Sequence, residues 1–153
     1  MDAVPNVHTL MDTRDAWIQI LEDKLVDGVY NTFCQMSVDA HNYASTHGGT
    51  TTDALRQLLN EVKLWNTQVI EDESKSLIGD ATEEFNDRLK MVFMASSMVL
   101  AAVRNNRKTS SSLNVTVPKT CKFVHTVFKL AAEELLRHTE LLVAQQNVQA
   151  QTY

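Results

Sequence analysis

The side chains best suited to hold a metal ion are scattered along this 153-residue sequence. The five histidines have neither HExxH nor paired-cysteine spacing and lie in different segments: His8, His41, His47, His125 and His138. Cys34 and Cys121 are far apart, as expected for two reduced thiols in a helical core. Motifs for a serine nucleophile, a phosphate-binding loop or a dinucleotide are missing from the sequence. The sequence therefore predicts no metal, no cofactor and no enzymatic activity.

One acidic run invites a different interpretation. Glu71, Asp72 and Glu73 follow Glu61 by a few helical turns, which resembles the carboxylate helix of a di-metal bundle. Such bundles repeat Glu-x-x-His on two helices, and that repeat does not occur here. The run is better interpreted as a solvated helix face or as a docking surface for a basic partner. Trp65, just before the run, is typical of a core or corner anchor.

Basic residues gather around one expected loop: Arg104, Arg107, Lys108, Lys119 and Lys122. They can complement the negative end of a helix dipole and add solubility. Alternatively they contact phosphate or an acidic neighbouring protein. Phe123 is the one aromatic residue close by, which weakens the case for a single-strand nucleic-acid site.

The net charge of −5 is divided unevenly along the chain. Residues 1–90 hold 7 Lys and Arg against 16 Asp and Glu, a net charge of −9, whereas residues 91–153 carry +4. This asymmetry favours head-to-tail contacts between copies, or a basic face that meets an acidic partner. Nucleic acid is an unexpected partner, because nucleic-acid-binding domains are usually basic overall.

The segment 90–104, KMVFMASSMVLAAVR, is the apolar centre of the sequence. Its apolar residues cover nearly every side of a helix, which predicts a buried central helix that the others surround. It is too short to cross a bilayer, which takes about 20 apolar residues, so no transmembrane segment is expected. Met91, Met94 and Met98 recur at helical spacing and fit core filling better than a cofactor pocket.

A very long helix is expected to precede it. After an arm over residues 1–11, Asp12 or Thr13 can cap a helix that continues to Gly48 and Gly49. Its apolar stripe repeats every three or four residues: Ile18, Leu21, Leu25, Val29, Phe33, Met36, Ala40 and Tyr43. Gly28 interrupts this helix at a cost near 1 kcal/mol and marks either a close contact or a bend.

The remaining segments complete an all-α single-domain bundle of four to five helices over residues 12–142. A second helix from Thr51 or Thr52 is expected to break near Trp65 and Asn66 and to end at Gly79. Asp80 with Glu83 resembles a cap for the central helix. Leu113–Val117 suits either an extended connector or a strand paired with another chain, with Val115 and Val117 as contacts. Pro118 is expected to open the last helix, and residues 143–153 to form a mobile polar tail.

Three blocks in one order carry a resemblance over Leu55–Leu142. They are LWNTQVIEDESKSLI (64–78), VFMASSMVLAAVR (92–104) and LNVTVPKTCKFVHTVFKLAAEELLRHTELL (113–142). In this order they resemble a family of small, functionally unassigned helical proteins of nucleocytoplasmic large DNA viruses. The positions that match the family pattern are Trp65, Asn66, Glu71, Pro118, Phe123, His125 and Glu134.

The resemblance implies a setting and brings no catalytic residue or cofactor. That setting is a large icosahedral virion assembled in host cytoplasm, where small minor capsid proteins lie beneath double jelly-roll capsomers. A minor capsid protein is therefore the leading hypothesis, with major and other minor capsid proteins and further copies of the chain as partners. The alternative is a cytoplasmic DNA-associated or regulatory factor that uses Arg104, Arg107 and Lys108.

Overall fold

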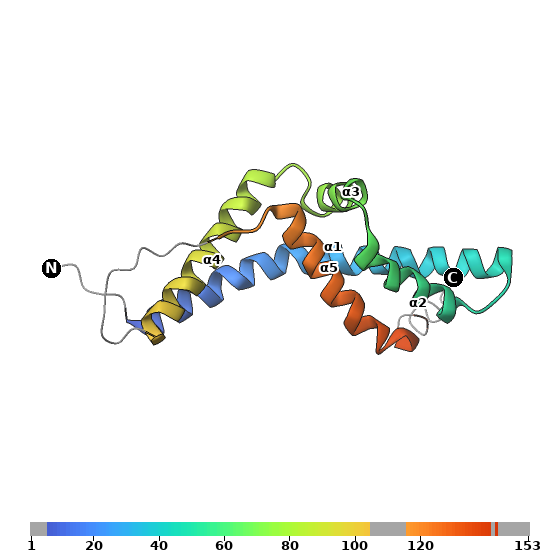
Figure 1. Cartoon of the computed structure of the whole chain (residues 1–153), viewed down its shortest axis with the longest axis horizontal. Coiled ribbons are helices and arrows are strands. Elements are labelled where there is room, and N and C mark those ends of the chain that lie inside the picture. The colour runs from blue at the N-terminus through green and yellow to red at the C-terminus, as the bar shows by residue number, and fades with distance from the viewer. Residues whose placement is uncertain (1–5, 105–115, 142, 144–153) are drawn as a thin grey trace. The chain divides into compact units, whose positions relative to one another are not determined.

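The computed structural model describes residues 6–104, 116–141 and 143, and confirms the all-α prediction for them (Figure 1). Its elements are α1 (Val7–His47), α2 (Thr51–Glu61), the 3₁₀ helix η1 (Val62–Leu64), α3 (Thr67–Ile78), α4 (Thr82–Arg104) and α5 (Thr120–Leu136). The long first helix is confirmed too. None of the helices in these ranges is long and apolar enough to cross a membrane.

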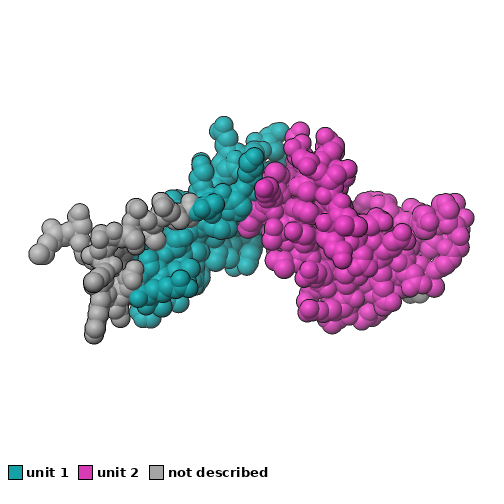
Figure 2. Space-filling model, in the orientation of Figure 1, with its two compact units in different colours: residues 1–25, 78–120 teal, residues 26–77, 121–153 magenta. Residues whose placement is uncertain are grey.

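The chain divides into two compact units, coloured separately in Figure 2. The first combines residues 1–25 with 78–120, and the second combines 26–77 with 121–153. In the first unit the buried apolar side chains are Leu21, Leu25, Ile78, Phe85, Leu89, Ala95 and Val99. In the second unit they are Phe33, Ala40, Ala44, Leu55, Leu59, Val62, Val124, Phe128 and Ala132.

The helix α1 begins earlier than the sequence predicts. Asn6 acts as its cap, because its Oδ1 accepts the His8 N–H at 3.1 Å and its backbone carbonyl accepts the Leu10 N–H at 3.1 Å. The expected start at Asp12 or Thr13 is therefore wrong, and residues 7–11 are helical. The hydroxyl of Thr13 instead donates to the Thr9 carbonyl at 2.8 Å, inside the helix.

The boundaries of α2 and α3 follow local signals in the sequence. Thr50 caps α2, since its hydroxyl accepts the Asp53 N–H at 3.1 Å. The predicted break near Trp65 is confirmed, and Asn66 caps α3 by accepting the Val69 N–H at 2.9 Å. Gly79 ends α3 with a φ of +65°, as expected for a glycine cap.

The helix α4 departs most from expectation. The sequence predicts burial nearly all round, but Met91, Met94 and Met98 are 40%, 50% and 36% exposed. One face alone is buried, through Phe85, Leu89, Ala95 and Val99. The prediction of a fully surrounded central helix is therefore wrong, because α4 is covered on one side.

Two smaller predictions about helix starts are also wrong. The backbone carbonyl of Ala81 accepts the Phe85 N–H at 3.0 Å, so Ala81 rather than Asp80 stands at the start of α4. Pro118 precedes α5 instead of opening it, and the first residue of α5 is Thr120. The hydroxyl of Thr120 donates to the side-chain oxygen of Asn86 on α4.

Candidate binding cavity

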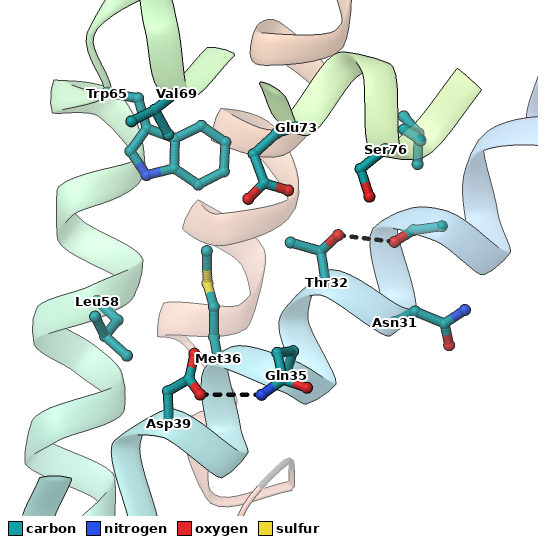
Figure 3. A pocket seen from close by; sticks show the side chains of 12 residues that line it. Asn31, Thr32, Gln35, Met36, Asp39, Leu58, Trp65, Val69, Glu73 and Ser76 are labelled. Carbon is teal, nitrogen blue, oxygen red and sulfur yellow. Dashed lines mark hydrogen bonds between the residues drawn. The ribbon is translucent and has the colours of Figure 1, made fainter. Parts of the chain in front are cut away.

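A cavity of about 520 Å³ lies within the second unit, between α1 and α3, with α2 and Trp65 at one end (Figure 3). Its volume is that of a small-molecule site. From α1 it is lined by Gly28, Asn31, Thr32, Gln35, Met36 and Asp39. The rest of the lining is Leu58, Trp65, Val69, Glu73, Ser76 and Leu77.

One wall is set by a close approach of two helices at Gly28. A Cβ atom built on Gly28 would lie 3.2 Å from Leu77 Cγ and 3.8 Å from Leu77 Cα, and still closer to Leu77 Cδ1. The absence of a side chain therefore lets α3 approach α1 at this end. Of the two roles that the sequence allows for Gly28, the structure supports the close contact.

The opposite end is fixed by a cluster around Trp65. Its ring stacks on His125 with centroids 5.9 Å apart and meets the edge of Phe128 at 5.3 Å. His125 Nε2 donates a hydrogen bond to the Val62 carbonyl at 2.8 Å, which holds α5 against the turn between α2 and α3. Trp65 is thus a corner anchor, as predicted, and it also forms part of the cavity wall.

Glu73 is the acidic group at the α3 side of the cavity. Its carboxyl group points from α3 toward Thr32 of α1 (Figure 3), and the side chain is half-buried. Burial raises the pKa of Glu73, and the neighbouring charge of Asp72 raises it further. Within the described residues Glu73 has neither a hydrogen bond nor an ion pair, so its charge is left to solvent or to a ligand.

A second carboxylate lies farther along α1. Asp39 Oδ1 accepts a hydrogen bond from the Gln35 amide at 3.0 Å, and Met36 lies between this pair and Trp65 (Figure 3). The Thr32 hydroxyl donates to the Gly28 carbonyl at 3.0 Å, which leaves its lone pairs free to accept. The cavity therefore has acceptor groups at both ends and apolar side chains between them.

The structure describes five of the eight residues that the sequence proposes as partner contacts. Glu71 and Asp72 are exposed on α3, and Arg104 is exposed at the end of α4. Arg107, Lys108 and Val115 lie outside the described residues. Val117 is half-buried, in a stretch without regular structure. Of the five described residues Glu73 alone lines the cavity, whereas the exposure of Glu71 and Asp72 fits both a solvated face and a docking surface.

Sequence reasoning missed the α1 side of the cavity. Asn31, Thr32, Gln35 and Asp39 occupy consecutive turns beside the apolar stripe of α1, a spacing that puts polar groups on one helix face. This row of polar residues, together with Gly28 one turn earlier, is the sequence pattern that could have predicted the α1 wall of the cavity. The described residues contain no group of three or more His, Cys, Asp or Glu placed to hold a metal ion.

Fold and cavity together define a small helical protein with an acidic, partly apolar cavity. The chain belongs to DUF5764, a family of unknown function, whose match spans residues 7–143. That range includes every described helix and the whole lining of the cavity. Neither the comparison with curated proteins nor the comparison with solved structures found a match.

Proposed function

We propose that this chain is a structural virion protein, a minor capsid protein of a large icosahedral DNA virus that links capsid proteins through protein–protein contacts. The setting is supported by the order of the three sequence blocks over 64–78, 92–104 and 113–142, which resembles small helical proteins of such viruses. The contact mechanism is supported by one structural observation, the exposed apolar face of α4.

That face has the spacing of a helix-packing surface. Met91, Met94 and Met98 are three and four residues apart, so they form one stripe along α4. The buried residues Leu89 and Val99 lie on a different side of the helix, against the core of the first unit. Each of these methionines is more than one-third exposed within the described residues, so the stripe can contact another protein.

Methionine suits such a contact for a physical reason. Its side chain is unbranched and polarizable, so a stripe of methionines adapts to the shape of a partner. Contiguous exposed apolar side chains are typical of protein interaction sites. Burying them on a capsid neighbour would favour association through the hydrophobic effect. The uneven charge of the chain, −9 over residues 1–90 and +4 over 91–153, would orient the contact.

The test is a high-resolution density map of the purified virion in which this chain is sought. The expected result is the chain at symmetry-related positions beneath the capsomers, with the Met91–Met98 stripe buried against another protein. A chain found there with the stripe facing solvent would reject α4 as the contact surface. A chain abundant in infected cells but missing from the virion would reject the structural role itself.

A further inference from the structure

We propose that the cavity between α1 and α3 binds a linear aliphatic polyamine, with one ammonium group at Glu73 and another at Asp39. This site is independent of the proposed capsid role, because none of its residues belongs to α4. Ligand binding and virion assembly can therefore fail separately.

The first ammonium position is defined by three acceptors. The Glu73 carboxylate and the Ser76 hydroxyl extend from α3, and the Thr32 hydroxyl faces them from α1 (Figure 3). An alkylammonium group has three N–H donors and no acceptor, so three convergent oxygens match it. Trp65 adds a ring to the same cavity, and aromatic faces attract cations within about 6 Å.

The second ammonium position is set by the geometry of α1. Asp39 lies seven residues after Thr32 on the same helix, which at 1.5 Å per residue is a separation of about 10 Å. Asp39 is exposed at the rim of the cavity, where one of its oxygens accepts from Gln35 and the carboxylate retains further lone pairs for an ammonium donor. A ligand that reaches both carboxylates must therefore be extended, with charge at its two ends.

Between the two ends the lining includes three apolar side chains beside the amide of Gln35. Met36, Leu58 and Val69 can pack against methylene groups, which an inorganic cation does not have. None of the lining residues is Lys, Arg or His, so an anionic ligand would meet two carboxylates without a counter-charge. Burial of an unpaired carboxylate is unfavourable, as the raised pKa of Glu73 indicates, and a bound ammonium would relieve it.

The test is isothermal titration calorimetry of the full chain with spermidine, cadaverine and n-butylamine at neutral pH. We expect cadaverine, which has charge only at its two ends, to bind more tightly than n-butylamine, and spermidine, whose middle ammonium would meet the apolar side chains, to bind less tightly than cadaverine. Glu73→Gln should weaken all three by about tenfold or more, because a charge-assisted hydrogen bond is lost. Asp39→Asn should weaken the two polyamines by a smaller factor, because Asp39 is exposed, and should leave n-butylamine unchanged.

Glu71→Gln is the matched control, since it removes the same charge from the exposed face of the same helix. It should change each affinity by less than about twofold, because exposed charges are screened. Equal losses of amine affinity for Glu71→Gln and Glu73→Gln would overturn the proposed site. They would instead indicate diffuse attraction of the amines to an acidic protein. Absence of heat with all three amines at millimolar concentration would overturn it as well.

A lysine side chain of another protein carries the same ammonium chemistry with a single charge. Nα-acetyl-lysine amide is the probe for that source. It should bind no better than n-butylamine if the ligand is a polyamine. Binding as tight as that of cadaverine, together with no effect of Asp39→Asn, would overturn the polyamine assignment. Circular dichroism of every variant should match the wild type, so that loss of folding is recognised.

Discussion

Replacing Gly28 with alanine tests the close approach of α1 and α3 that shapes the cavity. Two opposite effects are expected from the added methyl group. Alanine favours a helix interior over glycine by about 1 kcal/mol. The new Cβ, however, would lie 3.2 Å from Leu77 Cγ and closer still to Leu77 Cδ1, so Leu77 must leave its rotamer or α3 must shift. Overpacking of this kind costs about 1–3 kcal/mol.

The sum predicts that Gly28→Ala lowers the free energy of unfolding by about 1 kcal/mol. With Leu77→Ala in place the clashing atoms are removed, and the Leu77 Cα at 3.8 Å is an ordinary contact. In that background the same Gly28→Ala change should raise the free energy of unfolding by about 1 kcal/mol. The coupling energy between the two positions is therefore about 2 kcal/mol.

The assay is urea denaturation followed by circular dichroism for the wild type, both single variants and the double variant. Asn42→Ala, at an exposed position of α1, is the control for helix propensity and should stabilise by about 0.5 kcal/mol. The decisive result is that Gly28→Ala lowers the free energy of unfolding in the wild type and raises it in the Leu77→Ala background. If Gly28→Ala stabilises the protein in both backgrounds, α1 and α3 do not meet at Leu77 and the wall of the cavity is misplaced.

Three further changes test the second unit by denaturation. Phe128→Ala should lower the free energy of unfolding by about 3–5 kcal/mol, because Phe128 is 0% exposed, and a loss below about 1 kcal/mol would contradict its central place. Asn66→Ala should cost about 1 kcal/mol through the lost cap to the Val69 N–H, whereas the exposed Asn60→Ala should change stability by less than about 0.5 kcal/mol. Glu73→Gln should raise stability at pH 7. The raised pKa means that the folded state binds more protons than the unfolded state, so Glu73 becomes more destabilising as pH rises from its ordinary value of 4.5. If the gain in the free energy of unfolding from Glu73→Gln did not become smaller below pH 4.5, the predicted direction of the pH dependence would be refuted.

The opposite expectations for Glu73→Gln separate folding from binding. The substitution should stabilise the free protein and weaken its affinity for amines. A carboxylate that destabilises the fold and faces a cavity is typical of a functional site. A single variant therefore tests both the electrostatic environment of Glu73 and its assignment to ligand binding.

Local signals in the sequence determined most of the helix plan. Apolar residues every three or four positions predicted the long α1 and its buried stripe, which the structure confirms at Leu21, Leu25 and Phe33. Gly79 and the Trp65–Asn66 pair predicted an end and a break of helices for reasons confined to neighbouring backbone groups. The start of α1 was missed because Asn6, a good cap, precedes the more obvious Asp12 and Thr13.

Tertiary structure alone decided which surfaces are covered. An apolar residue favours burial wherever it occurs, so the composition of 90–104 predicted a helix surrounded on all sides. Whether Met94 is buried depends on how many neighbours pack on α4, and composition carries no information on that number. The cavity depends in the same way on contacts between distant residues. Gly28 and Leu77 meet because two helices cross where one lacks a side chain, and this packing turns Glu73 from the expected solvated face toward Thr32.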